Sequence, residues 1–434
     1  MTKHDALDGD DVDRRPHAVQ IWVTILVCGV SLVAGYMLKA CPSAIERTRL
    51  GFACHTDITA LYRARGIDRG VFPYVGGALK GDLEDGELSG YDLALVGGAN
   101  EYPVLTGLFM WTMGLFANDA GRYLAANAAF LSIAALVIAG VLGLLVGWRS
   151  LLWSGSPLLI LFAFHNWDLL AVAATTLGLL MWWRGHPTLA AVMFAIGGAL
   201  KLYPLLLVLP LVVERWWRGE RRGAAIDAAA AGGVAAAANL PLMLLDLDGW
   251  FVTYRFHSLR PPNYDSLWGV GPLYDLGPTT ITGLSGLLLL LTVVLVLVVA
   301  RRRADHEGSF PFIQTSAALI AAFLLWGKVQ SPQYALWIVP FFALVRVRAG
   351  WWIAYTIDAV VLYLGVFVLG TVSLRALEIV VPSAVYLRAL LLIVLIWVFL
   401  RSEDAIIPIG RPVTPSPSTD RASVIAGNGV ESSG

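Results

Sequence analysis

The chain has 434 residues, of which 57% are hydrophobic and only 14% are charged, and its formal net charge is zero. Soluble domains carry about 25% charged residues, so the composition excludes an ordinary water-soluble protein, and the zero net charge argues against a nucleic-acid partner. Apolar runs of about 13 to 25 residues recur without the alternation of a transmembrane barrel. The sequence therefore predicts an all-α polytopic membrane protein, because helices satisfy their own backbone hydrogen bonds in lipid.

The two ends of the chain differ from the middle. Residues 1–18 are polar and mixed in charge, and we expect a disordered cytoplasmic segment. The first apolar run, residues 20–38, is long for a signal peptide and lacks a small-residue cleavage site, which favours a permanent span. Residues 401–434 are rich in Pro, Ser, Thr and Gly and predict a disordered cytoplasmic tail. The membrane domain is therefore expected at 19–400.

A hydrophilic loop (39–103) follows the first span, and a second polar loop lies at 246–275. Arg149 belongs to an Arg-rich turn, which is expected on the cytoplasmic face, and the first loop is expected on the opposite face. An odd number of crossings must therefore separate them, yet two apolar runs lie between them. We therefore expect the short run at 104–117 to dip into the bilayer and return, and about twelve helices to span it. The other expected spans lie near 123–147, 151–164, 169–183, 188–200, 203–213, 224–245, 276–300, 311–327, 334–345, 350–371 and 383–400.

Clusters of Arg beside the apolar runs predict the orientation. "WRS" (148–150), "WWRG" (182–185), "RWWRGERRG" (215–223), "RRR" (301–303) and "RVR" (346–348) mark cytoplasmic turns. Both polar loops then lie on the extracytoplasmic face.

Three cysteines do not make a disulfide framework. Cys28 lies within the first apolar run and is expected to be a packed, inert thiol. Cys41 and Cys54 share the first polar loop, where an oxidising compartment would allow a disulfide between them; two free thiols are the alternative.

Asp57 begins the stretch "DITALYRARGIDRGVFPY". Its spacing, with Tyr62 early in the stretch, indicates a short helix, a Gly turn and an aromatic anchor at the membrane surface. A solvated acid on an interfacial helix is the alternative interpretation. Glu101 and Tyr102 close the same loop in "NEYP", where Glu101 either begins a helix or contacts a substrate hydroxyl.

Polar residues also interrupt the apolar runs. "HNWD" contains His165, Asn166 and Asp168 at one interhelical turn, more hydrogen-bonding groups than a helix cap requires, and predicts a polar pocket. Lys201 lies between two apolar runs, where an ammonium near the bilayer centre would cost about 2.5 to 3.5 kcal/mol. It either contacts a phosphate or extends to the membrane surface, and Pro204 breaks the helix beside it.

Two further segments, "RFHSLRPPNYDSLWGV" and "KVQSPQYALW", add cations on the face opposite the Arg-rich turns. Because the positive-inside rule does not account for cations there, we expect them to bind an anionic ligand. Their candidate residues are Arg255, His257, Arg260, Lys328, Gln333 and Tyr334. The chain has no metal-ligand, Walker or dinucleotide motif, so neither a metal nor a cofactor is expected.

"TDITALYRARGIDRGVFPY", "NEYPVLTG", "GALKLYPLLLVLPL" and "SPQYALWIVPF" together resemble glycosyltransferase family 87, over residues 19–400. This family contains actinobacterial mannosyltransferases that use polyprenol-phosphate mannose. The resemblance implies a GT-C fold in the plasma membrane, with an active site on the extracytoplasmic face that includes the first loop. It also implies a polyprenyl-phosphate sugar as the donor, a glycolipid or glycan as the acceptor, and no metal.

Within the resemblance, Asp57 matches the acid that acts as general base. The leaving lipid phosphate needs cations nearby, for which the candidates are Lys201, Arg255, Arg260 and Lys328. Tyr334 stands where some members carry a histidine, which leaves the sugar and the acceptor open. The expected substrate-binding residues are Tyr62, Glu101, Tyr102, His165, Asn166, Asp168, His257, Gln333 and Tyr334.

Two other functions fit the same residues. A transporter or flippase of an anionic lipid would also use cations and broken helices, although a loop of about 60 residues and the lack of an inverted repeat argue against it. A structural subunit of an envelope-synthesis complex would not need Asp57.

Overall fold

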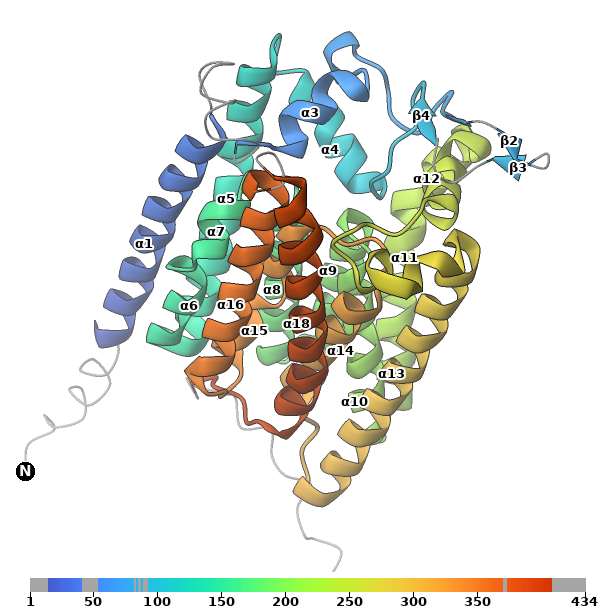
Figure 1. The fold of residues 1–434 in the computed structure, drawn as a ribbon. Helices are drawn as coiled ribbons and strands as arrows, with labels where there is room; N and C mark the ends of the chain where they lie inside the picture. The colour runs from blue at the N-terminus through green and yellow to red at the C-terminus, as the bar shows by residue number, and fades with distance from the viewer. Residues whose placement is uncertain are drawn as a thin grey trace, which may run out of the picture.

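Figure 1 shows the computed structural model, in which helices run side by side between the two ends of a bundle. The structure describes residues 15–40, 54–81, 83–84, 87–88, 93–369 and 373–407. The first helix begins at Arg15, within the segment expected to be disordered, and the tail from 408 onward lies outside the described residues. Cys41, half of the expected Cys41–Cys54 pair, also lies outside them.

Six helices of the described residues are long and apolar enough to cross a bilayer. A helix rises 1.5 Å per residue, so about 20 residues span a hydrocarbon core of about 30 Å. Large apolar side chains such as Leu26 and Leu290 are exposed on them, as expected of surfaces that face lipid. The all-α polytopic prediction is confirmed. The six are α1 (Arg15–Lys39), α5 (Ala120–Val146), α11 (Arg221–Leu245), α13 (Pro278–Glu307), α16 (Ala349–Leu364) together with its π-helical continuation to Leu369, and α18 (Leu374–Arg401).

The remaining bundle helices are shorter, and several are broken. The break after α9 has a local cause, since Pro204 has no N–H with which to continue an α-helix and sits instead in a 3₁₀ turn. The short pieces are α6 (Leu151–Ser154), α7 (Pro157–Phe162), α8 (Asp168–Trp183), α9 (Pro187–Leu200), α10 (Val208–Trp217), α14 (Phe312–Trp326) and α15 (Val339–Leu344), with the 3₁₀ turns η2 (Gly147–Ser150), η3 (Tyr203–Leu207) and η6 (Pro332–Trp337) and the π-turn η7 (Gly365–Leu369).

The helix α4 (Val104–Gly114) coincides with the run expected to dip into the bilayer. Its 11 residues correspond to about 16 Å, roughly half of the hydrocarbon thickness. In Figure 1 it lies at the same end of the bundle as α3 (Asp57–Ala64) and α12 (Leu247–Leu259). It is too short to cross, which leaves α5 as the crossing between the first loop and Arg149.

Hydrogen bonds gather the Arg-rich turns at one end of the bundle. Arg149 donates to carbonyl oxygens within residues 342–345 at 2.7 to 3.0 Å. Arg303, at the end of α13, donates to the carbonyl oxygens of Leu400 and Ser402 at 2.8 Å. The arginine turns that are far apart in the sequence therefore share one end, as the charge pattern predicts.

The first loop lies at the other end. The main-chain N–H of Asp57 donates to the carbonyl of His165 at 2.8 Å. The ammonium of Lys39, at the end of α1, donates to the carbonyl of His55 at 2.9 Å. These bonds fix the start of the loop onto the turn between α7 and α8.

The rest of this loop is a small folded cap. Tyr74 is buried and its hydroxyl donates to the carbonyls of Tyr102 and Pro103 at 2.9 Å, while the N–H of Gly76 donates to the carboxylate of Asp246 at 2.7 Å. The second contact joins the two polar loops. The cap also contains η1 (Ile67–Arg69), the antiparallel pair β1 (Ala78–Lys80) and β4 (Ala94–Val96), and the antiparallel pair β2 (Leu83–Glu84) and β3 (Glu87–Leu88).

The second polar loop contains more helix than its composition indicates. Asp246 caps α12 by accepting from the N–H of Gly249 at 2.8 Å. The turns η4 (Leu267–Gly269) and η5 (Gly271–Leu276) follow.

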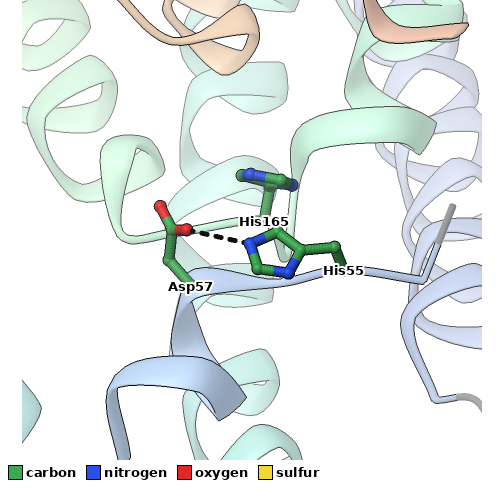
Figure 2. A group of neighbouring side chains, drawn as sticks. All are labelled: His55, Asp57 and His165. Atoms are coloured by element: carbon green, nitrogen blue, oxygen red, sulfur yellow. Dashed lines mark ion pairs between the residues drawn. The ribbon is translucent and has the colours of Figure 1, made fainter. Parts of the chain in front are cut away.

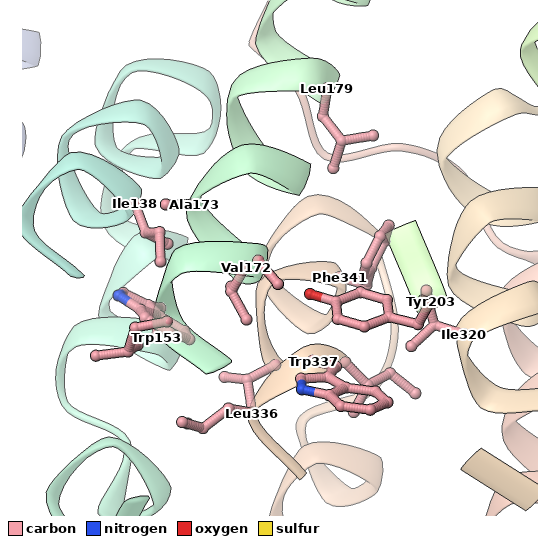
Figure 3. Packing of buried hydrophobic residues seen from close by; sticks show 14 of the residues in the cluster. Ile138, Trp153, Val172, Ala173, Leu179, Tyr203, Ile320, Leu336, Trp337 and Phe341 are labelled. Carbon is pink, nitrogen blue, oxygen red and sulfur yellow. The ribbon is translucent and has the colours of Figure 1, made fainter. Parts of the chain in front are cut away.

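Aromatic and aliphatic side chains from all parts of the chain fill the interior of the bundle. Figure 3 shows Trp153, Tyr203 and Trp337 among them, all buried. The ring of Tyr203, beside the break after α9, stacks on Trp337 of η6 with centroids 4.3 Å apart. The packed core therefore reaches the place where α9 and η6 end, which is the floor of the cavity described next.

Candidate active site

A cavity of about 530 Å³ lies where the short helices stop. Its walls come from the start of α3, the end of α9, one side of α12 and the end of α14. Since these bundle helices end early, the space above them remains open beneath the loops. Of the residues expected from the sequence, the cavity wall includes Asp57, Glu101, Tyr102, Lys201, His257, Arg260, Lys328, Gln333 and Tyr334.

Asp57 is the first residue of α3. Thr56 adopts an extended conformation before it and caps the helix, accepting from the N–H of Ile58 at 3.2 Å. The Thr56 hydroxyl also donates to the carbonyl of Phe164 at 2.7 Å. The local sequence therefore holds the acid against a turn that is more than a hundred residues away.

The two carboxylate oxygens of Asp57 have different partners. Oδ1 lies 3.5 Å from His55 Nε2, and Oδ2 lies 3.4 Å from the hydroxyl of Tyr102. Burial raises the pKa of Asp57, but the hydrogen bond from His55 and the charge of Lys201 outweigh it, so the pKa of Asp57 lies below its usual value. Asp57 is therefore an ionised carboxylate at neutral pH, able to accept a proton.

Figure 2 shows Asp57 with His55 and His165. Burial lowers the pKa of His165 to about 3, so its ring is neutral. Their ligand atoms all lie within 4.8 Å of one another, a spacing that a metal ion would accept. Nζ of Lys39 lies 3.4 Å from His165 Nδ1, at the edge of this group.

Lys201 lies in the cavity wall and is paired within the protein. Its ammonium forms a 3.0 Å ion pair with Asp168, whose side chain is 1% exposed. The same nitrogen lies 4.7 Å from the ring centres of both Tyr102 and Tyr334. The ion pair and the aromatic rings compensate the burial of this charge within the cavity floor.

Glu101 is paired as well. Arg65 Nε and a terminal nitrogen donate to its two oxygens at 2.6 and 3.0 Å, a bidentate pair. Its carbonyl accepts from His257 Nε2 at 2.7 Å, and burial lowers the pKa of His257 to about 4. A neutral His257 with its proton on Nε2 therefore fastens α12 to the first loop.

The four candidate cations have unequal surroundings. Arg260 lines the cavity, with the amide oxygen of Asn263 at 3.0 Å and the ring of Phe256 at 5.2 Å. Lys328 also lines it, but its ammonium donates to the carbonyls of residues 258 and 260 at 3.0 Å and to Thr282 at 2.5 Å. Arg255 is exposed and is not part of the wall.

Four other expected residues lie behind the wall. The hydroxyl of Tyr62 donates to the carbonyl of Ala117 at 3.2 Å, and its ring stacks on another tyrosine. Asn166 accepts from the N–H of Asp168 at 2.9 Å. Tyr62, His165, Asn166 and Asp168 therefore support the site from outside the cavity.

One wall of the cavity is apolar. Ser285, Gly286 and Leu289 contribute to it from α13, and Phe323 and Trp326 from α14. A side chain built on Gly286 would meet no atom within 4 Å. This wall adjoins the lipid-facing side of α13, where Leu287, Leu290 and Leu291 are exposed.

A second cavity of about 480 Å³ shares Arg260 and Asn263 with the first. Phe256, Tyr264 and Tyr274 line its other sides. Arg260 and Asn263 thus line both cavities.

Sequence reasoning missed several residues that the structure brings to the site. His55 stands two positions before Asp57, and the extended Thr56 turns both side chains to one side, a spacing that could have indicated the pair. No local pattern brings Lys39, Thr253 or Trp337 to the site, because each depends on how distant helices pack.

The model of glycosyltransferase family 87 matches residues 101–326, slightly more than half of the chain. The matched part runs from Glu101 through α14 and includes Lys201 and Arg260, whereas Asp57 precedes it. A search of curated proteins found no match.

Proposed function

The chain belongs to glycosyltransferase family 87 and is a membrane glycosyltransferase, and from this premise we propose which sugar transfer it performs. It moves a hexose, mannose in the first instance, from a polyprenyl-phosphate donor to a glycolipid or glycan acceptor. The reaction takes place on the extracytoplasmic face of the plasma membrane and needs no metal. The observation that carries the proposal is one cavity with an ionised carboxylate, Asp57, and a guanidinium, Arg260, in its wall.

Asp57 is the general base of this reaction. The acceptor hydroxyl attacks the anomeric carbon of the donor, the bond from that carbon to the phosphate oxygen breaks, and the hydroxyl proton passes to Asp57. The low pKa of Asp57 keeps it ionised for this step.

The transfer inverts the configuration at the anomeric carbon. Retaining enzymes use a second carboxylate as nucleophile, and among the described residues of the wall the other carboxylate, Glu101, is bound by Arg65. A single displacement with Asp57 as base is the mechanism that these two acids allow.

Arg260 is the main contact for the leaving phosphate. Its partners, Asn263 and Phe256, carry no negative charge. Lys201 is neutralised by Asp168 and Lys328 uses three acceptors of the protein, so these two lysines add positive potential to the cavity and hold its walls. A guanidinium also binds phosphate oxygens in pairs.

The apolar wall supports a lipid-borne donor. A polyprenyl chain can leave the cavity past Gly286 and Leu289 toward the exposed leucines of α13. The second cavity, beyond Arg260, is lined by tyrosines and Asn263, side chains suited to a sugar surface, and is open to an acceptor.

The opposite end of the bundle supports the orientation. The arginine turns at 148–150, 301–303 and 346–348 lie there, and short Arg-rich turns stay cytoplasmic. The cavity then faces outward.

Purified protein in proteoliposomes, supplied with labelled polyprenyl-phosphate mannose or arabinose and with extracted membrane lipids, tests the proposal. We expect labelled glycolipid from the mannose donor, with inverted anomeric configuration by NMR. Movement of the labelled donor across the bilayer with no glycosidic product would instead favour a flippase, and product from arabinose alone would change the sugar.

A further inference from the structure

The two oxygens of Asp57 have one partner that lines the cavity and one that does not. Asp57 and Tyr102 belong to the cavity wall, and Oδ2 lies 3.4 Å from the Tyr102 hydroxyl. His55 and His165 are not part of the wall, and His55 Nε2 faces Oδ1 from behind at 3.5 Å. The carboxylate thus lies between Tyr102, which lines the cavity, and His55, which does not.

The imidazole of His55 is fixed independently of Asp57. Its ring stacks on Phe367 with centroids 5.6 Å apart and planes at 16°, and lies 5.6 Å from the ring of His165. Its carbonyl accepts from Lys39 at 2.9 Å. Thr56 is extended, so His55 and Asp57 project to the same side of the chain.

His165, the other histidine beside Asp57, has different partners. Its Nδ1 lies 3.4 Å from Nζ of Lys39, and its buried ring is neutral.

We propose that His55 is a positioning residue for Asp57: it donates Nε2–H to Oδ1 and so directs Oδ2 at the acceptor hydroxyl. The inference rests on the proposed function of Asp57. In the transfer, the acceptor oxygen bonds to the anomeric carbon, the electron pair of the broken bond stays on the phosphate oxygen, and the proton moves to Oδ2.

The 3.5 Å distance is longer than the usual 2.7 to 3.2 Å of an N–H···O hydrogen bond. Hydrogen bonds of catalytic groups often tighten only when substrate binds. We expect a bound acceptor hydroxyl to draw the carboxylate into line and shorten the contact.

The test compares His55→Ala with His55→Gln, whose amide retains an N–H, and with His306→Ala, an exposed histidine on α13 near the Arg-rich end. We expect His55→Ala to lower kcat about 10- to 100-fold, the effect of one hydrogen bond to a charged group, with little change in either KM. His55→Gln should retain most of the activity, and His306→Ala all of it. Imidazole in the buffer should restore part of the kcat of His55→Ala.

The pH profile separates positioning from general support of the fold. The groups facing Asp57 are His55, His165, Lys201 and Tyr102, with Lys39 behind His165. Loss of the hydrogen bond from His55 raises the pKa of Asp57, so the acidic limb of kcat/KM should move to higher pH in His55→Ala and stay near the wild-type position in His55→Gln.

Three results would overturn the inference. Unchanged kcat in His55→Ala, with Asp57→Asn inactive, refutes the role of His55 and leaves the proposed function intact. Equal loss in His55→Ala and His55→Gln with no imidazole rescue makes the effect structural. Loss of wild-type activity with a chelator, reversed by Zn²⁺, makes His55 a metal ligand. An active Asp57→Asn would instead contradict the proposed function itself.

Discussion

The ion pair between Lys201 and Asp168 allows the sharpest test of how the cavity floor is built. The side chains are 10% and 1% exposed and the charged atoms lie 3.0 Å apart. Removal of one partner of a buried pair costs about 3 to 5 kcal/mol, because the other charge is left without compensation. Replacement of both by apolar residues of similar volume is often neutral.

The surroundings decide where each variant lies in this range. In Asp168→Leu, the ammonium keeps the rings of Tyr102 and Tyr334, each worth up to about 2 kcal/mol when desolvated, so we expect about 3 kcal/mol of destabilisation. In Lys201→Met, the carboxylate loses the partner that is 3.0 Å away, so we expect about 5 kcal/mol. The double variant Lys201→Met with Asp168→Leu should lie within about 1 kcal/mol of wild type.

Reversible unfolding in mixed micelles, followed by tryptophan fluorescence, measures all four proteins in one double-mutant cycle. Arg301→Met with Asp305→Leu, a pair whose side chains are 47% and 53% exposed, is the control and should show weak coupling. Costs below 1 kcal/mol for both single variants at Lys201 and Asp168, or a double variant that costs their sum, would refute the buried-pair account.

Three further predictions concern the cavity. Arg260→Ala should raise the KM for the donor about 10- to 100-fold, because a charge-assisted contact is lost. Arg255 is exposed and lies outside the cavity wall, so Arg255→Ala should leave this KM unchanged. Equal effects of the two variants in donor titrations would contradict the ranking of the two arginines. Burial lowers the pKa of Lys328 from 10.5 to about 8. Between these two pH values the unfolded chain binds one more proton than the folded chain, so the stability contributed by Lys328 rises with pH, while donor affinity falls because the cavity loses a positive charge. A pH series in which Lys328→Met behaves like wild type would argue against both expectations. Chelators should leave the transfer rate of the purified protein unchanged, and a loss that added Mg²⁺ or Zn²⁺ restores would show that the reaction needs a metal.

The sequence predicts the fold well because lipid restricts the choices. In lipid, a long apolar run satisfies its backbone hydrogen bonds by forming a helix, so α1, α5 and α13 lie close to the predicted spans. The 11 residues of α4 are too few to cross the bilayer. Helix boundaries were less predictable: α18 begins at Leu374 rather than near 383, because Pro382 is accommodated within the helix.

The sequence predicts which polar residues gather at the site, but it does not predict which of them pair with one another. Lys201 and Asp168 are both identified by their position between apolar runs, yet their pairing depends on the packing of α8 against the end of α9. Glu101 forms an ion pair with Arg65, and Lys328 donates hydrogen bonds to three acceptors. These partners come from other segments of the chain, so the spacing of residues in the sequence does not predict them. The sequence could therefore not rank the four cations.

The central claim is tested most directly by single-turnover sugar transfer in proteoliposomes with wild type, Asp57→Asn and Asp68→Asn. Asp68 belongs to the same loop, contacts Arg69 at 3.8 Å and is not part of the cavity wall. We expect Asp57→Asn to slow the chemical step about 10²- to 10⁴-fold, with donor binding retained and Asp68→Asn unchanged. Transfer by Asp57→Asn at the wild-type rate would show that the proton of the acceptor goes elsewhere.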